Sequence, residues 1–357
     1  MRKNTKRYGA VLGVVIGAVA MSACRYTGFS DAPSKSTAAT ATGWLVDQQQ
    51  PDGGFELAGF AGFETSDAIL AIAENAQQQV DWNTTQARSA VRAVKTNHHD
   101  ALHYIDDFVD STTARINAGS AAKVIVLVAK PLGLAVTNFN PDGDTGKNLV
   151  GVLNGGAQPN GSYGTFNATA YAAIAKKLVD GSVPANTVAF IRAGQEASGG
   201  WDFNGEPTGD EADVDSTSIA IQALAAAGVP GTDADLRAGL AYLADHQRAD
   251  GAWESFAQPD PNSTSTAIFA ITAAGFDPAS PCWRNVVRPG RTGQPYTAPT
   301  VWLRSQQNTG VPTPADAGRI NSPSDSFGVS TFATSQSIQA FRRGWNPVSP
   351  LEPQACP

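Results

Sequence analysis

The sequence predicts an all-α fold in which about twelve helices form two concentric rings, as six helix-pair repeats. A motif built on glutamine and glycine recurs along the chain, with about 50 residues per repeat. Each copy is followed by an alanine-rich run with apolar residues at helical spacing. Because one helix pair cannot bury its apolar faces alone, neighbouring pairs must stack, and a closed ring lets every pair do so.

The first element of each repeat ends in an aromatic residue, an aliphatic residue, three variable residues and a glutamine. The clear copies hold Trp44-Leu45 with Gln49, Phe190-Ile191 with Gln195, Tyr242-Leu243 with Gln247, and Trp302-Leu303 with Gln307. In the first three, another aromatic residue follows six positions after the glutamine: Phe55, Trp201 and Trp253. Since these residues recur in repeat after repeat, we expect them to hold the turns of a scaffold and not to contact a ligand.

The second element of each repeat is a helix rich in small residues. The six segments are 65–76, 116–133, 167–178, 216–228, 263–275 and 330–341. Ser, Thr or Asn opens most of them, which is typical of helix N-caps. Alanine allows close packing, so we expect these helices to form the inner ring, where the circumference is short.

The pattern Gln-x-x-Asp-Gly-Gly-Phe at residues 49–55, with its variants ending in Trp, resembles the QW and prenyltransferase repeats of the terpenoid cyclase and protein prenyltransferase superfamily. The resemblance covers residues 43–345 and implies an α6/α6 toroid. This superfamily also includes vitamin B12 carriers and the complement thioester domain, so the fold alone does not choose a function. The Cys-Gly-Glu-Gln motif of thioester domains does not occur in this chain, which excludes that class.

An acidic motif opens the segment 216–228. Class II terpene cyclases carry Asp-x-Asp-Asp followed by Thr at this place, and its second aspartate protonates the substrate. Here Asp213, Asp215 and Thr217 match that motif, while Ser216 replaces its last carboxylate. The resemblance therefore offers Asp213 and Asp215 as catalytic residues. The alternative, which we favour, is that these carboxylates stabilise the N-terminus of a helix.

We expect no metal and no cofactor. His99 and His103 are four positions apart, but on a polar segment such a pair is usually solvated surface. Asn140, Asp142 and Asp144 alternate as in a calcium loop, yet Thr145 and Gly151 stand where an EF-hand requires Gly and Glu. The sequence therefore favours a plain connecting turn at this place.

The N-terminus has the anatomy of an export signal. Four basic residues precede an apolar run, which ends in Met-Ser-Ala-Cys at residues 21–24 and resembles a bacterial lipobox. We expect residues 1–24 to be the signal, Cys24 to carry lipid, and the small, polar residues 25–42 to form a flexible tether. The protein would then lie outside the cytoplasm, tethered to the membrane by the lipid.

Without the signal's four positive charges the net charge of −7 becomes −11, which argues against nucleic acid as a partner.

In an oxidising compartment the two remaining cysteines, Cys282 and Cys356, are expected to form a disulfide. This bond would tie the C-terminal tail, residues 346–357, to the toroid of residues 43–345.

A ligand is expected at the mouth of the ring, where the inner helices begin. The polar residues at those ends are Glu64, Asp67, Asn167, Asp213, Asp215, Asn262 and Ser330. The sequence favours a non-catalytic protein that binds an apolar small molecule, such as an isoprenoid or a corrinoid, or an extracellular protein. The alternative is a class II cyclase-like enzyme with Asp215 as the proton donor.

Overall fold

The computed structural model describes residues 31–57, 60–78, 81–111, 116–323, 325, 331–347 and 350–352. Over these residues the fold is all-α, with fourteen α-helices and one short hairpin of β1 (Glu254–Ser255) and β2 (Gln258–Pro259). No helix among them combines the length and the apolar character that a membrane span requires. Residues 1–30, including Cys24, lie outside the described part of the chain.

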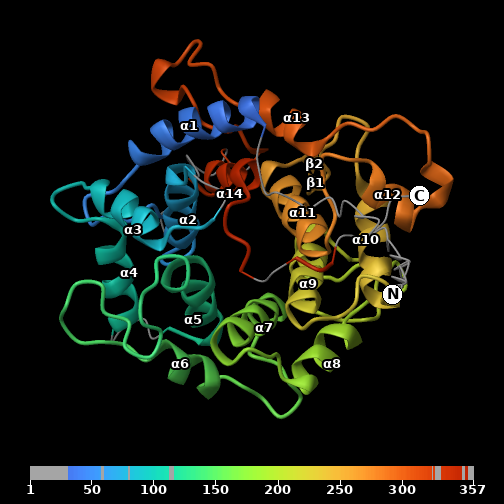
Figure 1. Ribbon diagram of the computed structural model, residues 1–357, viewed down its shortest axis with the longest axis horizontal. Coiled ribbons are helices and arrows are strands. Elements are labelled where there is room, and N and C mark those ends of the chain that lie inside the picture. Colours follow the sequence, from blue (N-terminus) through green and yellow to red (C-terminus); the bar gives the residue numbers. More distant parts are fainter. Residues whose placement is uncertain are drawn as a thin grey trace, which may run out of the picture.

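The inner ring consists of six helical segments, as the sequence predicts. They are α2 (Thr65–Ala76), α5 (Ala118–Val124) with its π-helical continuation Ile125–Ala129, α7 (Phe166–Asp180), α9 (Val214–Ala226), α11 (Pro261–Ala273) and α14 (Thr331–Arg342). Each segment packs against the next, and α14 packs against α2, so the ring is closed (Figure 1).

The outer layer surrounds this ring. Its helices are α1 (Ala32–Val46), α3 (Thr84–Ala93), α4 (Ala101–Asp110), α6 (Leu149–Gly155), α8 (Ala185–Ala193), α10 (Ala234–His246), α12 (Cys282–Val287) and α13 (Pro299–Ser305). The alanine-rich helices thus lie inside and the aromatic-ending helices outside, which confirms the predicted arrangement.

The prediction of a flexible tether up to residue 42 is wrong where the structure describes it. Helix α1 begins at Ala32, and the Asp31 carboxylate caps it by accepting the Ser34 N–H at 2.7 Å. Ala38 and Ala41 are fully buried, and α1 packs against α14 and α2. A run of small residues in which apolar positions do not recur at helical spacing resembles a linker. The same small residues also allow two helices to approach closely.

The repeated glutamines are scaffold residues. The side-chain amide of Gln49 donates to Gly53 O at 3.0 Å within its own turn, and that of Gln195 donates to Gly199 O at 2.8 Å. Gln195 also reaches the next outer helix, because the same amide donates to Asp235 O at 2.8 Å. Both glutamines therefore close a glycine turn, as the sequence predicts, and Gln195 in addition joins two neighbouring repeats.

The aromatic residues of the turns are anchored in the same way. Trp201 and Trp253 are fully buried, and their indole N–H groups donate to Ile191 O at 2.6 Å and Leu243 O at 2.8 Å. A threonine in the first turn of each following inner helix completes the anchor. Its hydroxyl accepts the backbone N–H of the aromatic residue, in the pairs Phe55–Thr65, Tyr163–Thr169, Trp201–Thr217 and Trp253–Thr264.

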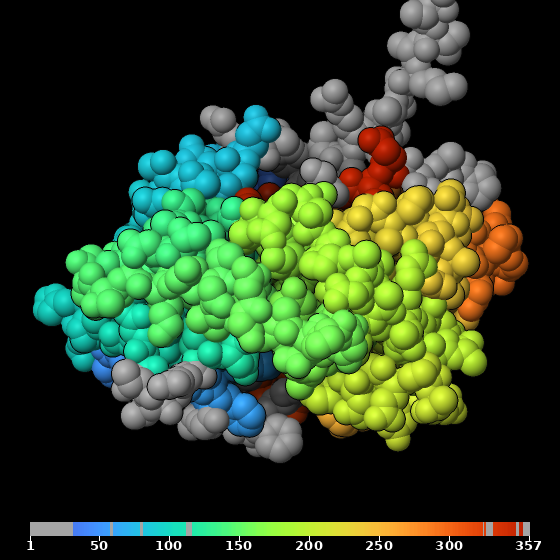
Figure 2. Space-filling model, turned by 90° about the horizontal axis from the view of Figure 1, so that it is seen from below, coloured from blue at the N-terminus to red at the C-terminus, as the bar shows by residue number. Residues whose placement is uncertain are grey.

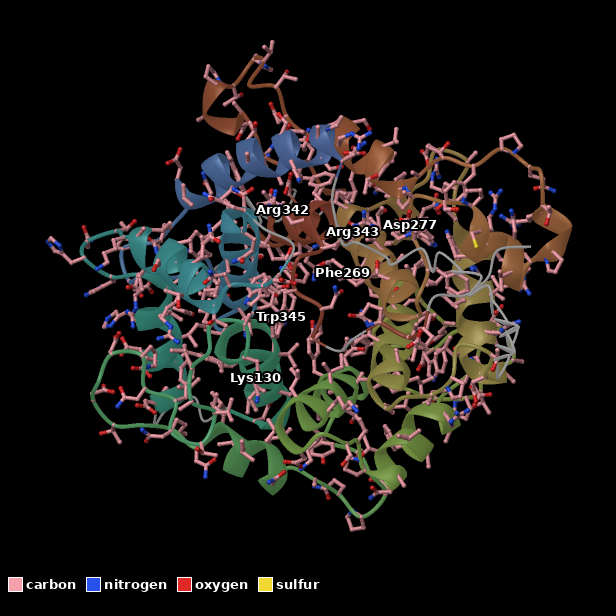
Figure 3. The ribbon with its side chains drawn as sticks, viewed as in Figure 1. Lys130, Phe269, Asp277, Arg342, Arg343 and Trp345 are labelled. Atoms are coloured by element: carbon pink, nitrogen blue, oxygen red, sulfur yellow. The ribbon has the colours of Figure 1, made fainter. Side chains whose placement is uncertain are left out.

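The chain after α14 crosses one face of the ring. Figure 3 shows Arg343 and Trp345 near the middle of the ring, and Figure 2 shows the C-terminal residues, in red, on the upper face of the disc. Further on, the Leu351 N–H donates to Ala273 O at the end of α11, at 3.0 Å. Cys282 is buried at the start of α12, and Cys356 lies outside the described residues, so their disulfide stays a prediction.

Candidate functional site

A cavity of about 870 Å³ occupies the centre of the ring. All six inner segments contribute to its wall, and residues 343 and 345–347 of the C-terminal segment line it at the end where the inner helices stop. At the other end, where the inner helices begin, Phe63, Phe203 and Phe256 line the cavity, although they are 46%, 61% and 99% exposed. The cavity therefore has an aromatic mouth on the side of the glycine turns.

Asp215 lies in the first turn of α9 and lines the cavity. Its two carboxylate oxygens accept hydrogen bonds from α11: from the Ser263 hydroxyl at 3.1 Å and from the Thr266 hydroxyl at 2.9 Å. Burial, followed by the charge of the neighbouring Asp213, raises the pKa of Asp215 to about 6. Asp215 is therefore partly protonated near neutral pH and is a weaker acid than an ordinary aspartic acid.

Asp213 is the N-cap of α9. Its carboxylate accepts the Ser216 N–H at 2.7 Å, and its own backbone N–H donates to Trp201 O at 2.9 Å. Burial raises the pKa of the Asp213 carboxyl, against the effect of the hydrogen bonds that it accepts from Ser216 and Asp215. Asp213 thus has the capping role that we favoured from the sequence. Thr217, the other residue matching the cyclase motif, is fully buried behind the cavity wall, where it anchors Trp201.

Asp67 forms a second charged centre, at the start of α2. It is 2% exposed, and its Oδ2 lies 2.8 Å from the Lys123 ammonium on α5. The same ammonium lies over the rings of Phe63 and Phe332, at 4.7 and 5.4 Å from their centroids. Because the two rings are themselves in contact, at 4.8 Å, they cover the ion pair on the side of the mouth.

Further polar side chains lie along the mouth and link Asp67 to α11. Asn262 donates to the Gln336 amide oxygen at 3.2 Å, and Gln336 in turn reaches Asp67 Oδ1 at 3.5 Å. Tyr171 on α7 completes the set: burial raises the pKa of its hydroxyl, and the nearby charges of Asp67 and Asp215 raise it further. All six inner segments thus bring polar groups to one end of an otherwise apolar cavity.

Glu74 lies at the opposite end of the cavity and is 2% exposed. Its Oε1 accepts the Trp345 N–H at 3.1 Å, while its Oε2 is buried and has no hydrogen-bond partner. Burial raises the pKa of Glu74 to about 8, so this carboxyl is neutral at pH 7. A neutral carboxyl facing the cavity can donate one hydrogen bond to a ligand.

The structure places most of the predicted site residues around the cavity. Asp67, Asn167, Asp213, Asp215 and Asn262 all line it. Glu64 does not: it is buried in the ring seam, where its carboxylate accepts the Thr331 N–H at 3.1 Å and the Thr331 hydroxyl. Ser330 lies outside the described residues.

Sequence reasoning missed several cavity residues. Lys123, Tyr171, Glu74 and Trp345 occupy positions that carry no motif, and only the closed ring brings them to one space. The one available signal was a charged residue within an alanine-rich helical segment, since Glu74 and Lys123 both interrupt runs of small and apolar residues.

The histidine pair and the suspected calcium loop lie away from this cavity. The rings of His99 and His103 stack at 4.2 Å, and His103 pairs with the Asp142 carboxylate. Asp142 also contacts Arg92 at 3.3 Å, so this side chain is engaged in ion pairs.

No family model matches this chain, and no curated protein sequence matches it. Among solved structures it is similar to the type II terpene cyclase MstE from Scytonema in complex with geranylgeranyl dihydroxybenzoate, its substrate. The identity is 14% and the TM-score 0.57, over 87% of this chain and 97% of the other.

A protein from Actinoplanes is 18% identical with a TM-score of 0.54, over 87% and 99% of the two chains. Haptocorrin in complex with Cbi is 11% identical with a TM-score of 0.50, over 92% and 71%. At such identities the likeness concerns the fold, and this chain has the α/α-toroid fold of the terpenoid cyclases.

Proposed function

We propose that the protein binds an apolar small molecule in the central cavity, without catalysis. The observation that carries this proposal is the cavity itself, whose 870 Å³ lies within the roughly 300–1,000 Å³ of known small-molecule sites. Most of its wall is apolar, and a few polar groups stand at its two ends. Such a wall favours a hydrocarbon with polar ends over a ligand that is polar throughout.

An isoprenoid with a hydroxyl or carbonyl end group fits this arrangement best. The apolar body would lie along Leu70, Ile174 and Ile219 on the inner helices. Two polar atoms in the wall, Glu74 Oε2 and Asn167 Oδ1, are buried and have no protein partner. Because burying such atoms without a hydrogen bond is costly, a polar end group of the ligand would supply the missing partner. A corrinoid is the second ligand to test, because the fold is similar to that of haptocorrin in complex with Cbi.

A class II cyclase reaction remains the alternative, since Asp215 lies in the wall and keeps a proton at mildly acid pH. Three observations favour binding over catalysis. A pKa raised to about 6 makes Asp215 a poor acid for protonating an alkene, and Ser216 replaces the carboxylate that would activate it. The hydroxyls of Ser263 and Thr266 hold Asp215 toward α11.

The binding proposal is tested with linear isoprenoid alcohols, by calorimetry on the purified domain and by native mass spectrometry for a co-purified ligand. Ile219→Trp fills the cavity and is expected to weaken binding at least tenfold, which is about 1.4 kcal/mol. Val301→Trp is the matched control, because Val301 lies exposed on the outer helix α13. No affinity for any isoprenoid or corrinoid, or equal affinity in the two variants, would reject the proposal.

The same preparations separate binding from catalysis. A cyclised product that forms with wild type and is absent with Asp215→Asn would show that the alternative is correct. We expect the isoprenoid to be recovered unchanged from both proteins.

We further propose that the protein acts outside the cytoplasm, anchored by lipid at Cys24. The proposal rests on the basic start, the apolar run and the Met-Ser-Ala-Cys ending of the first 24 residues. Cys24→Ser is expected to move the protein from the membrane fraction to the soluble extracytoplasmic fraction. An unchanged fractionation would contradict lipidation.

A further inference from the structure

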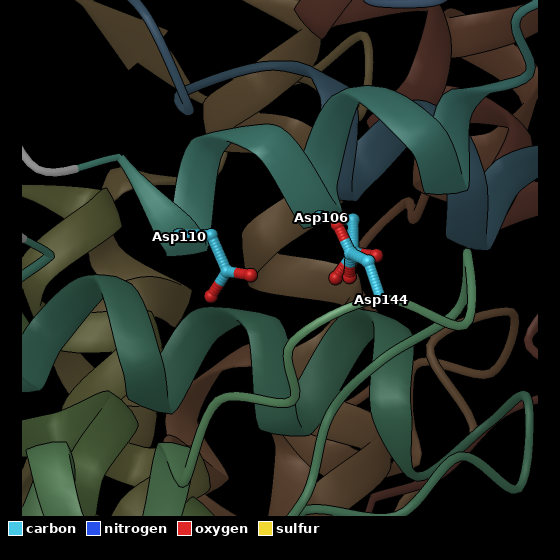
Figure 4. Close-up of side chains that lie close together, drawn as sticks. All are labelled: Asp106, Asp110 and Asp144. Atoms are coloured by element: carbon cyan, nitrogen blue, oxygen red, sulfur yellow. The ribbon is translucent and has the colours of Figure 1, made fainter.

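Three carboxylates from two parts of the chain meet beside α4, and none of them lines the cavity. Asp106 and Asp110 are four positions apart on this helix and share one face, and Asp144 comes from the loop of residues 138–148. One oxygen of each lies within 4.8 Å of the others, and Figure 4 shows the Asp110 carboxyl pointing toward the other two. Oxygens that bind one Ca²⁺ at about 2.3–2.6 Å lie at comparable distances from one another, so this spacing is compatible with a shared ion.

Asp106 is the buried member of this cluster. The residue is 2% exposed, and its Oδ2 accepts the Asp142 N–H at 3.1 Å, which fixes the carboxyl plane. Its Oδ1 is buried and has no hydrogen-bond partner. A buried carboxylate oxygen without a partner is costly, and an ion is one of the few things that would offset this cost.

The basic groups of this region do not neutralise the cluster. Arg92 contacts Asp100 at 2.8 Å and Asp142 at 3.3 Å, and His103 also pairs with Asp142. Burial raises the pKa of Asp110, and the charge of Lys147 only opposes this rise. Among the described residues Lys147 forms no ion pair with any of the three carboxylates. Burial first, and then the charges of Asp144, Asp142 and Asp110, raise the pKa of Asp106 to about 6.

The loop that carries Asp144 is built to hold it in place. The Asn140 side-chain oxygen accepts the Asp144 N–H at 2.8 Å, and its amide donates to Asp144 O at 2.9 Å. Phe139 and Lys147 exchange two backbone hydrogen bonds at 2.8 Å, which closes the base of the loop. Of the alternating residues 140, 142 and 144, only Asp144 therefore faces the cluster, and α4 supplies the other two carboxylates.

We propose that Asp106, Asp110 and Asp144 together bind one Ca²⁺. All three ligands are carboxylate oxygens, which suits a hard cation and disfavours Zn²⁺, which prefers nitrogen and sulfur. Asp144 is exposed, so water can complete the six to eight ligands that Ca²⁺ takes. The ion would tie the outer helix α4 to the loop that leads into α6.

The test compares thermal unfolding and calorimetric Ca²⁺ binding after the protein is stripped with a chelator. About 1 mM Ca²⁺ is expected to raise the melting temperature of wild type, and equimolar Mg²⁺ to raise it less. Asp106→Asn and Asp144→Asn are expected to lose this response, and Asp106→Asn to melt above wild type in the absence of Ca²⁺, because it removes an unpaired buried charge. Asp107→Asn is the matched control, since its exposed side chain on the same helix lies outside the cluster.

Two results would overturn the proposal. One is that stripped wild type binds no Ca²⁺ at this concentration and melts unchanged. The other is that the Asp106 and Asp144 variants bind Ca²⁺ as well as Asp107→Asn does, which would place the ion elsewhere. If Asp106→Asn fails to fold, Asp110→Asn, at a partly exposed position, decides between these outcomes.

Discussion

Glu74 Oε1 accepts the backbone N–H of Trp345 at 3.1 Å, which joins the end of the first inner helix to the segment that follows the last one. The Trp345 indole N–H adds a second link, because it donates to Val126 O at 3.2 Å. The floor of the cavity is therefore held by a carboxyl group that is buried and protonated at neutral pH.

This carboxyl makes stability depend on pH. In the folded protein the pKa of Glu74 is raised from 4.5 to about 8, so between these values the folded chain holds a proton that the unfolded chain has lost. The free energy of unfolding contributed by Glu74 therefore falls as pH rises from about 4.5 to about 8. Glu74→Gln keeps an acceptor for Trp345 and is expected to remove this slope.

Urea unfolding of both proteins at a series of pH values measures the difference. The window from pH 6 to pH 8 is the informative one. The pKa values of Asp106 and Asp215 are raised to about 6, so these two groups also change stability at lower pH and would mask the effect of Glu74 there. Parallel curves for wild type and Glu74→Gln in this window would contradict the prediction.

The threonines that anchor the turns are expected to be equivalent. Thr217 accepts the Trp201 N–H at 2.9 Å and Thr264 accepts the Trp253 N–H at 3.0 Å, and both threonines are fully buried. Replacing either by valine leaves a buried N–H unpaired, so each variant should lose about 1–3 kcal/mol of unfolding free energy. Ligand affinity should stay unchanged in both. A loss of ligand or product confined to Thr217→Val would instead support its role in a cyclase motif.

Trp253→Ala is expected to destabilise the protein by about 3–5 kcal/mol, since it removes a fully buried indole from the scaffold. Trp253→Phe should be much milder, because it keeps most of the packing and loses only the hydrogen bond to Leu243 O. Thermal unfolding of the two variants measures this difference. If Trp253→Ala melted like wild type and lost its ligand, the tryptophan would belong to a binding site.

The predicted bond between Cys282 and Cys356 can be tested by alkylation. The described part of the tail already reaches the end of α11, where Leu351 contacts Ala273. We expect no alkylatable thiol in the mature, non-reduced protein unfolded in denaturant, and two after reduction. Cys282→Ser should lower stability by about 2–4 kcal/mol. Two free thiols before reduction would contradict the pairing.

The ring itself could be predicted because its information is local and repeated. Gln49, Gln195 and Gln247 each bond to their own turn four residues on, so sequence spacing alone fixes the contact. Helix α1 could not be predicted in this way. Before Trp44 its buried positions hold only Ser, Thr and Ala, which differ little from its exposed ones, and its main partner α14 lies nearly 300 residues away in the chain.

In the site, too, the residues with a local sequence signal could be predicted and the others could not. Asp213 and Asp215 could be found because helix-start chemistry is visible in a short motif. The pairing of Asp67 with Lys123, and of Glu74 with Trp345, joins residues 56 and 271 positions apart, and nothing near either residue indicates its partner. Such pairs follow from ring closure, which local periodicity does not describe.

Ring closure also sets the order in which this protein can fold. The seam is made where Thr331 donates to Glu64 across 267 positions of sequence, and α1 packs on α14 only once both exist together. Until α14 is available, the apolar sides of α2 and α11 have no neighbour across the seam. High contact order slows folding, so this chain should stay open until nearly all of it has been synthesised, and its last inner helix should control the rate of compaction.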